Sequence, residues 1–413
     1  MSSTATDAPR GPLHGVSVLE LGSTVAGPFC GRLLADFGAR VVKVEAAQGD
    51  AVRTFGEHAQ GRSLYAASIL RNKELVALDL RTPRGRDIAR RMALQVDVLV
   101  ENFRPGTLER WGLGYEALSK DNPGLVMVRI SGFGQDGPYS ARPGYGVTSE
   151  AVSGLRELTG DPDRPPPRVA VSLTDYITGL YAAFGAVMAL NVRARSGRGQ
   201  VVDAALYESA FSFTEPHVPA YDQLGVIATR AGSRLPGNTP NNLYPTADGR
   251  HVCIAAGNPS IFRRLCAAMG QGELADNARF ATPADRSRNE DTLDDIIARW
   301  TATLSVEALE RALLEAEVPS ARIYNMADIF ADAHYRARDM LVPVEDPVLG
   351  PVMVPGIVPR LSDNPGAVRW GGRDVGADTR AALRDLAGLG DDEIDALERD
   401  GVVRCIPVGE DGR

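Results

Sequence analysis

Short apolar runs alternate with amphipathic segments through the first third of the chain. Five of these runs have the length and composition of buried strands: Val16–Leu21, Val41–Glu45, Leu75–Leu80, Val96–Glu101 and Leu125–Ser131. Between them, Phe29–Phe37 and Thr82–Leu94 have helical periodicity, and Thr82 followed by Pro83 is typical of an N-cap and first turn. Strands separated by such helices predict βαβ units, and therefore an α/β fold with a mainly parallel, doubly wound sheet.

The pattern changes after Ser131. Residues 132–167 are rich in Gly, Pro and Asp, and a long helical stretch, Tyr176–Arg195, precedes a further apolar segment, Gln200–Leu206. The later part of the chain predicts one strand and three helical stretches: Arg250–Ala256, Ser260–Gly270, Thr292–Ala316 and Asp378–Arg399. The strand and the first two of these stretches indicate a second, smaller domain.

The composition and charge limit the class of protein. With 413 residues, 44% hydrophobic and 24% charged, the chain is globular and long enough for two or three folding units. A net charge of −8 argues against a nucleic acid or an anionic membrane as partner. No apolar run approaches the ~20 residues that span a bilayer, and the first residues lack the apolar core of a signal peptide, so no membrane partner is expected.

The cysteines and histidines point away from disulfide and metal chemistry. The cysteines are far apart, with no C-x-x-C pair: Cys30, Cys253, Cys266 and Cys405. This arrangement favours reduced thiols in the cytoplasm over a disulfide framework. The five histidines show no metal-ligand spacing, so no metal is expected.

Two glycine-containing segments are candidates for a nucleotide loop. Gly132–Gly137 spells G-x-G-x-x-G after a strand, but Pro138 and further turn residues follow where that motif needs a helix to begin. The first strand-to-helix turn, Gly22–Pro28, is better placed, because open α/β sheets bind ligands at the carboxyl ends of their strands. The chain has no G-x-S-x-G elbow, which argues against a serine hydrolase of that kind.

Asp175 is the third candidate, at the start of the long apolar helix. One interpretation is ordinary N-capping of the helix by Asp175 or Thr174. The other is catalytic, since the helix end favours the ionised carboxylate, which can attack an activated acyl group without a separate base. The residues alone leave both interpretations open.

Several segments, in this order and spacing, form a known pattern. They are Val18–Leu21 with Ala26–Pro28, Asp36–Ala39 with Val42–Glu45, Asn72-Lys73, Leu78–Leu80, Glu101–Gly106, Gly112–Tyr115, the Asp175 segment, and Gly197–Gln200. On these motifs the chain resembles the family III CoA-transferases, a group that includes formyl-CoA and carnitine CoA-transferases and the α-methylacyl-CoA racemases. The resemblance covers about residues 15–403.

The resemblance implies an activity and a set of site residues. Asp175 would attack an acyl-CoA to give a mixed anhydride, then carry CoA as an aspartyl thioester before an incoming acid reverses these steps. Coenzyme A and its acyl esters would be substrates, with no permanently bound cofactor and no metal. The CoA site would include Lys73, Asn102, Phe103, Arg104 and Arg110, since cations suit the phosphates and an aromatic wall suits adenine.

The resemblance also implies an architecture: a Rossmann-like large domain, a small α/β domain, and a homodimer of two interlocked rings. The implied divisions are a disordered tail (1–12), the first part of the large domain (13–205), a linker (206–228), the small domain (229–325), and a linker with a C-terminal segment that returns to the large domain (326–413). The active site would lie between the large domain of one subunit and the small domain of the other.

Departures from the family pattern leave alternatives open. Ala46 replaces an arginine that follows the second strand in some members, and Ala255–Asn258 replaces a glycine run, which disfavours an oxalate-specific enzyme. A racemase is the closest alternative, but Gly144-Tyr145-Gly146 stands where racemases resemble one another in Gly-His-Asp, and tyrosine is a poor base. A non-catalytic CoA-binding homologue is a second alternative.

The acceptor acid is the least defined part of the prediction. The segment from Arg234 to Asn242 contains an arginine flanked by amides, a combination that can bind the distal carboxylate of a dicarboxylic acid. Arg234 and Asn238 are therefore candidate substrate residues, with a polar turn as the competing interpretation.

Overall fold

The computed structural model of the protein describes residues 11–406, which form two compact units. The first unit comprises the described parts of Met1–Leu155, Val169–Val218 and Tyr335–Arg413, and the second comprises Arg156–Arg168 and Pro219–His334. The chain therefore enters the second unit twice. A β-bridge between Gly160 and Gly232 joins its two pieces.

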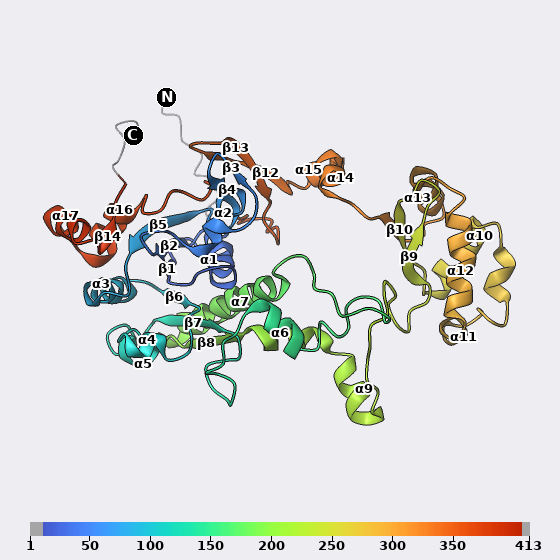
Figure 1. Cartoon of the computed structure of the whole chain (residues 1–413), viewed down its shortest axis with the longest axis horizontal. Coiled ribbons are helices and arrows are strands. Elements are labelled where there is room, and N and C mark those ends of the chain that lie inside the picture. The colour runs from blue at the N-terminus through green and yellow to red at the C-terminus, as the bar shows by residue number, and fades with distance from the viewer. Residues whose placement is uncertain (1–10, 407–413) are drawn as a thin grey trace. The chain divides into compact units, whose positions relative to one another are not determined.

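The first unit is built on a seven-stranded sheet of order β14-β5-β2-β1-β6-β7-β8 (Figure 1). Its strands are β1 (Ser17–Glu20), β2 (Arg40–Glu45), β5 (Lys73–Leu78), β6 (Val98–Glu101), β7 (Val126–Ser131), β8 (Val201–Ala205) and β14 (Val403–Arg404). All pairs are parallel except β14 with β5. The predicted parallel α/β sheet is thus confirmed. The strand order reverses between β1 and β6, where such folds bind ligands.

Helices cover both faces of this sheet. One face carries α3 (Pro83–Ala93), α16 (Thr379–Ala387) and α17 (Asp391–Arg399), whose apolar side chains form one core cluster. The other carries α1 (Ala26–Asp36) and α7 (Leu173–Ser196), with Ala182, Ala186 and Ala189 of α7 in a second cluster. Small side chains on α7 allow close packing on the sheet: a Cβ on Gly185 would lie 2.5 Å from Val202 Cγ1.

Smaller elements complete the first unit. They are η1 (Ala51–Thr54), β3 (His58–Ala59), β4 (Arg62–Ser63), α2 (Leu64–Ile69), α4 (Thr107–Arg110), α5 (Tyr115–Leu118), α6 (Gly146–Val152), α8 (Leu206–Phe211), η2 (Ser212–Thr214) and the hairpin of β12 (Leu341–Asp346) and β13 (Gly350–Pro355). Short helices α9 (His217–Leu224) and α15 (Ala333–Ala337) lie where the chain passes from one unit to the other.

The second unit is a three-stranded antiparallel sheet with helices. Its elements are β9 (Asn241–Pro245), β10 (His251–Ala255), β11 (Ser320–Arg322), α10 (Pro259–Ala268), η3 (Gly272–Asp276), α11 (Pro283–Arg288), α12 (Glu290–Thr301), α13 (Val306–Glu315) and α14 (Met326–Ala331). Its core gathers apolar side chains of the sheet, α10, α12 and α13, among them Tyr244, Phe262 and Leu309.

Several predicted boundaries differ from the structure. The helical stretch Thr292–Ala316 is two helices, α12 and α13, and Asp378–Arg399 is broken at Gly388, which adopts a left-handed conformation. Residues 156–168 belong to the second unit rather than to the range 13–205, and Arg230 of that unit donates to the Asp161 carbonyl. The range predicted as a linker, 206–228, contains α8, η2 and α9, and the second unit continues to His334. Of the tail predicted at 1–12, residues 1–10 lie outside the described residues.

Helix α7 corrects a further expectation from the sequence. Its 24 residues, with a mean hydropathy of 1.3 over 18 of them, are long and apolar enough to cross a membrane by length and composition. The sequence suggested no such segment. In the structure one face of α7 packs on α1, β7 and β8, and 44% of that apolar window is buried.

Four charged side chains are buried together beneath the turn that follows β1. Lys43 Nζ lies 3.1 Å from Glu20 Oε1 and 2.8 Å from Asp50 Oδ2, and Lys73 Nζ lies 2.6 Å from Glu20 Oε2. Each of the four side chains is at most 1% exposed. Two acids and two bases balance in charge, which a buried cluster requires. We refer to Glu20, Lys43, Asp50 and Lys73 as the buried charge cluster.

The buried charge cluster fixes the main chain of the turn above it. Lys43 donates to the Gly22 carbonyl and Lys73 to the Pro28 carbonyl, while the N–H of Thr24 donates to Asp50 Oδ1 at 2.9 Å. Thr24 has a φ of +72°, a left-handed conformation that costs free energy in a residue with a branched side chain. The cluster holds that conformation.

Replacement of Asp50 by asparagine tests the cluster. Burial would raise the pKa of Asp50, but Lys43 and the N–H groups of Val52 and Thr24 outweigh it and hold the pKa below its ordinary value of 3.8. Asp50→Asn removes one of the two negative charges that pair with the buried Lys43 ammonium group. We therefore expect the free energy of unfolding at neutral pH to fall by about 3 kcal/mol. A carboxyl with a lowered native pKa stabilises the fold above its unfolded pKa, and that contribution disappears as the pH falls through the native pKa.

The stability difference between wild type and Asp50→Asn should therefore narrow as the pH falls below 3.8. Denaturant unfolding of both proteins between about pH 7 and about pH 3 measures the difference. The exposed Asp363→Asn is the control, with an expected change within about 0.5 kcal/mol. A difference that stays constant or widens toward acid pH would contradict this role of Asp50.

Candidate active site

The strand-order reversal between β1 and β6 is closed by Asn102. Its Oδ1 accepts a hydrogen bond from the Ser23 N–H at 2.8 Å, and its Nδ2 donates to the Ser23 carbonyl at 2.8 Å. Gly22 allows this approach, because a Cβ there would lie 3.2 Å from Asn102 Oδ1. Asn102 thus joins the turn after β1 to the end of β6, and its amide is engaged by the protein itself.

A cavity of about 300 Å³ lies on one side of Asn102, at the carboxyl ends of β1, β2 and β5. Its walls include apolar side chains of these strands, such as Leu21, Val44 and Leu78, together with Phe103 and Trp111. The Phe103 and Trp111 rings meet edge to face with centroids 5.2 Å apart. Arg81, whose side chain is 75% exposed, stands at the rim. We call this space the first cavity.

Phe103 is positioned by a chain of ion pairs, of which Arg129–Glu101 is buried and Arg129–Glu109 is partly exposed. Its N–H donates to Glu101 Oε2 at 2.8 Å, while Arg129 contacts Glu101 at 2.8 Å and Glu109 at 2.7 Å. Burial raises the pKa of Glu101, and Arg129 opposes that effect. These contacts tie the end of β6 to β7 and α4, so the Phe103 ring has a fixed backbone.

A cavity of about 280 Å³ lies on the other side of Phe103, which lines both spaces. It is lined by Asn102, Phe103, Arg104, Pro105, Ser131, Gly132, Ser140, Arg142, Pro143, Gly144, Tyr145 and Thr148. Neither Arg104 nor Arg142 forms an ion pair within residues 11–406, and the Arg142 guanidinium lies 3.5 Å from the centroid of the Tyr139 ring. We call this the second cavity, and its spare positive charge suits an anion.

Asp175 lies beside the second cavity. It is the third residue of α7, and a Cβ on Gly146 would lie 2.3 Å from its Oδ2. Gly146 begins α6 and directly follows Tyr145, which lines the second cavity. The carboxylate is therefore pressed against a backbone that only glycine permits, in the first turn of a long helix, whose dipole favours a negative charge.

The capping interpretation of this segment is wrong. The N-cap position of α7 is Ser172, which makes no side-chain cap, and the Thr174 hydroxyl instead donates to the Gly146 carbonyl at 3.1 Å. The next residue, Tyr176, anchors the helix through a 2.7 Å hydrogen bond between its hydroxyl and that of Tyr65. Asp175 is held in place without serving as the cap.

The structure corrects the expected role of Lys73. Lys73 is the first residue of β5, at the end of the strand away from the two cavities, and it is fully buried against Glu20. It cannot meet a phosphate there. Arg81, beyond the carboxyl end of the same strand, lines the first cavity, and the rule that ligands lie at carboxyl ends would have selected it.

The other predicted CoA residues fall into two groups. Asn102, Phe103 and Arg104 come together along the second cavity, and Phe103 also lines the first. Arg110 is exposed on α4, where it donates to the Thr107 hydroxyl at 3.0 Å, and it lines neither cavity. Arg142 lines the second cavity. It was not predicted from the sequence, because its segment lacks any periodic pattern. The G-x-G-x-x-G run has no helix before Gly146, and its Gly132 forms part of the second cavity wall.

The predicted substrate residues lie in the second unit, in a setting that does not support a carboxylate site. Arg234 is surrounded by acids of its own unit, at 2.8 Å from Asp291, 2.8 Å from Asp294 and 3.8 Å from Glu290. A dicarboxylate would have to compete with these three carboxylates for the Arg234 guanidinium. Asn238 is exposed, and its Oδ1 lies where a Cβ on Gly257 would sit. Among residues 11–406, no group of three or more His, Cys, Asp or Glu is placed to hold a metal ion.

Comparison with known proteins gives one consistent family. The sequence profile described as CoA-transferase family III matches residues 13–379. The chain is 46% identical, over 97% of its length and 100% of the relative's, to a succinyl-CoA–D-citramalate CoA-transferase of Chloroflexus aurantiacus. It is 40% identical, over 95% of its length and 98% of the relative's, to the beta subunit of a succinyl-CoA–L-malate CoA-transferase of the same organism.

The fold agrees with these sequence relatives. A crystal structure of a CaiB/BaiF family protein from Brucella suis superimposes with a TM-score of 0.81 at 34% identity, covering 91% of this chain and all of that one. One conclusion follows from the parallel-dominated α/β unit, the two cavities at its strand-order reversal, and these relatives. The protein belongs to the family III CoA-transferases and is a CoA-transferase.

Proposed function

We propose that the enzyme moves CoA from an acyl-CoA to a free carboxylic acid through covalent intermediates on Asp175. The observation that supports this most directly is the position of the carboxylate, fixed by Gly146 at the border of the second cavity. A positioned carboxylate can act as the nucleophile itself, so the reaction requires neither a metal nor a histidine base.

The proposed reaction has four balanced steps. An Asp175 oxygen attacks the thioester carbonyl of the donor, and the C–S bond breaks to give a mixed anhydride and CoA thiolate. The thiolate attacks the aspartyl carbonyl, which releases the donor acid and leaves an aspartyl-CoA thioester. The acceptor carboxylate displaces the thiolate to form a second anhydride, and the thiolate then takes the acceptor's acyl group and frees Asp175. Because acyl activation is conserved throughout, positioning supplies much of the rate.

The two cavities suit the two ends of CoA. The first cavity offers an apolar and aromatic wall for adenine, with Arg81 at its rim, where a phosphate would compete with Asp79, now 2.9 Å from the guanidinium. The second offers Arg104 and Arg142 to the remaining phosphate charge or to the acyl group, and Gly146, which adjoins its lining residue Tyr145, contacts Asp175. Phe103 belongs to both cavities, so one extended ligand can run past it.

Similarity to relatives supports a class of substrates. The two relatives from Chloroflexus are named for succinyl-CoA as donor and for D-citramalate or L-malate as acceptor, and a relative from Haloarcula hispanica is named for succinyl-CoA and mesaconate. We propose succinyl-CoA as the donor and a small dicarboxylic acid of this kind as the acceptor.

The geometry disfavours the racemase alternative. Racemisation beside the thioester needs an acid and a base at the α-carbon. Tyr145, in the Gly144–Gly146 stretch, precedes α6 at the border of the second cavity, and none of the five histidines lines either cavity. The carboxylate of Asp175 also disfavours a purely binding homologue, since CoA affinity alone needs no nucleophile there.

Asp175→Ala should abolish CoA exchange between succinyl-CoA and free acids while leaving CoA affinity within a few-fold of wild type. Loss of the nucleophile should lower kcat by at least about a thousandfold. Initial rates of exchange, followed by chromatography of the CoA esters, measure the first effect, and calorimetric titration with CoA measures the second. The exposed Asp363→Ala is the matched control and should keep full activity.

Hydroxylamine trapping identifies the intermediate. Wild-type enzyme incubated with succinyl-CoA and hydroxylamine should carry a hydroxamate on the peptide that contains Asp175, and Asp175→Ala should carry none. Exchange at the wild-type rate in Asp175→Ala would refute the mechanism. Incorporation of deuterium at the α-carbon of a branched acyl-CoA, without CoA exchange, would instead establish a racemase.

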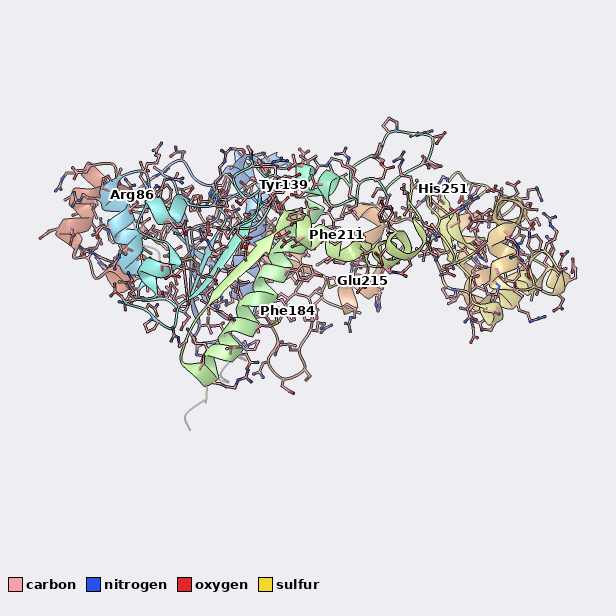
Figure 2. The ribbon with its side chains drawn as sticks, turned by 90° about the horizontal axis from the view of Figure 1, so that it is seen from below. Arg86, Tyr139, Phe184, Phe211, Glu215 and His251 are labelled. Atoms are coloured by element: carbon pink, nitrogen blue, oxygen red, sulfur yellow. The ribbon has the colours of Figure 1, made fainter. Side chains whose placement is uncertain are left out.

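We also propose the homodimer implied by the family, supported by the apolar outer face of α7. Leu180, Phe184, Met188 and Val192 follow one another at four-residue spacing and are 57%, 57%, 48% and 42% exposed. Phe184 and Phe211 are labelled in Figure 2, where α7 runs across the near side of the first unit. A contiguous apolar stripe of this kind is typical of a protein interface.

The double variant Phe184→Glu/Met188→Glu should weaken or abolish the dimer, because two buried carboxylates would lack partners. Size-exclusion chromatography with light scattering, over a range of concentrations, reports the mass. Leu314→Glu serves as control, since Leu314 is an exposed apolar residue of the second unit. A monomeric wild type would disprove the proposed homodimer.

A reducing compartment such as the cytoplasm is the proposed location. All four cysteines are unpaired in the structure, and Cys30 and Cys266 are buried. Burial raises the pKa of the Cys266 thiol to about 11, so it is mainly protonated and unreactive at neutral pH.

A further inference from the structure

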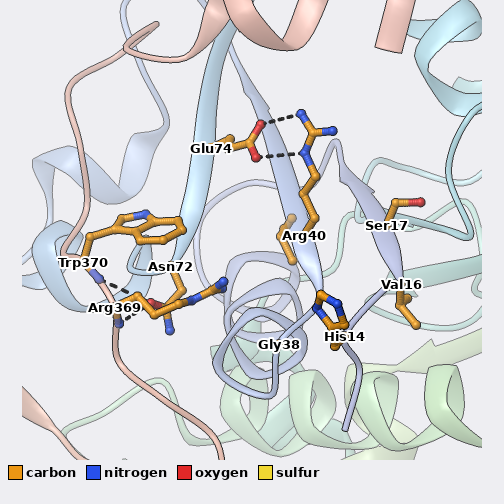
Figure 3. A pocket seen from close by; sticks show the side chains of 11 residues that line it. His14, Val16, Ser17, Gly38, Arg40, Asn72, Glu74, Arg369 and Trp370 are labelled. Carbon is orange, nitrogen blue, oxygen red and sulfur yellow. Dashed lines mark hydrogen bonds and ion pairs between the residues drawn. The ribbon is translucent and has the colours of Figure 1, made fainter. Parts of the chain in front are cut away.

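A third cavity, of about 350 Å³, lies at the opposite edge of the main sheet from the proposed active site. Val16 and Ser17 at the start of β1, Arg40 at the start of β2, and Asn72 and Glu74 around the start of β5 line it. These are amino ends of parallel strands, whereas the first and second cavities lie at carboxyl ends. Arg369 and Trp370, from the segment that returns after the second unit, close one side (Figure 3).

This closing segment is held rigidly by one buried side chain. Asn72 Oδ1 accepts from the Arg369 N–H at 2.7 Å and from the Trp370 N–H at 3.4 Å. Asn72 Nδ2 donates at 2.8 Å to Asp36 and at 2.8 Å to the Ala367 carbonyl. The Trp370 indole N–H donates to the Lys73 carbonyl at 3.1 Å. The cavity wall is therefore preformed, which lowers the cost of binding a ligand.

The two arginines of this cavity differ in their charge balance. Arg40 is neutralised by Glu74, which accepts two hydrogen bonds at 2.8 and 2.9 Å, and also contacts Asp385. Arg369 forms no ion pair within residues 11–406. It donates to the Ala35 carbonyl at 3.2 Å and lies 4.6 Å from the centroid of the Trp370 ring.

The unmatched charge faces the cavity. In Figure 3, Arg369 reaches from the closing segment toward the middle of the cavity, Arg40 points away toward Glu74, and His14 stands across from Arg369. Burial lowers the pKa of Arg369, although Asp36 and Glu74 partly oppose this effect, so the cation is only partly compensated. A ligand carboxylate would restore the balance through a two-pronged hydrogen bond.

We propose that this third cavity binds a small organic carboxylate, with Arg369 as its ion-pair partner and Trp370, Val16 and Val41 against its apolar part. The volume lies at the lower end of the range for small-molecule pockets, about 300–1,000 Å³. It suits a free acid rather than an acyl-CoA. The site is separate from Asp175, so the proposal stands apart from the transfer mechanism.

Calorimetric titration of the full chain tests the proposal. The protein carries Asp175→Ala to prevent turnover and is saturated with CoA to occupy the transferase site. Succinate, citramalate, benzoate and inorganic phosphate are the probes. We expect saturable binding of at least one of the carboxylates, with one site per chain, and quenching or enhancement of Trp370 fluorescence. Trp370→Phe should remove this optical change.

Arg369→Gln should weaken carboxylate binding about tenfold or more, and Arg369→Lys, which keeps the charge, should weaken it less. Arg373→Gln is the matched control, because Arg373 lies 4.7 Å from the same Trp370 ring but pairs with Asp378 and does not line the cavity. The carboxylate affinity of the Arg373→Gln protein should stay within about twofold of the wild-type value. Circular dichroism confirms that each variant is folded.

Three results would overturn the proposal. The first is the absence of saturable binding of every carboxylate to the CoA-saturated protein. The second is equal carboxylate affinity in wild type and in folded Arg369→Gln. The third is binding of phosphate alone. None of these outcomes depends on transferase activity, so failure of the site and failure of the Asp175 mechanism are distinguishable.

Discussion

The first unit depends on charge balance inside its own sheet. Glu20 lies on β1, Lys43 on β2, Asp50 in the loop after β2, and Lys73 on β5. Each of these charged side chains needs the others, because an unpaired buried charge is costly. Their contacts with the turn after β1 hold Thr24 in a left-handed conformation and present Ser23 to Asn102. The first cavity, which Ser23 and Phe103 line, therefore takes part of its shape from charged side chains buried beneath the turn.

The two edges of the same sheet have different chemistry. At the carboxyl edge, glycines let backbones approach closely, and Gly146 brings the main chain against Asp175. At the amino edge, Asn72 fixes a returning segment that leaves the Arg369 cation partly compensated. Strand β5 contributes to both, since Asn72 precedes it, Lys73 begins it and Arg81 follows it. One strand thus connects the buried charge cluster with two separate cavities.

Sequence reasoning succeeded where a local pattern carries the information. Val98–Glu101 and Val126–Ser131 were located within two residues because strands buried on both faces are nearly continuous apolar runs. Sequence reasoning failed where two interacting residues are far apart along the chain. Lys73 resembled a surface cation, and its partner Glu20 is 53 residues away. Strand β14 has only two residues and pairs antiparallel with β5, a contact that no periodicity reveals. Asp175 was proposed as the nucleophile only through family resemblance, since the residues around it alone left helix capping open as an interpretation.

The discontinuity of the first unit has a consequence for biogenesis. Its sheet needs β14, at Val403–Arg404, and the helices α16 and α17 that cover one face, all of which leave the ribosome after His334 closes the second unit. The smaller unit can therefore fold first, while one face of the sheet is still without α16 and α17 and is covered by α3 alone among its three helices. Chaperone binding during translation should concentrate on that nascent sheet, and a stop codon within the last helices should yield insoluble chains even though Asp175 and the residues that line the first and second cavities have all been synthesised.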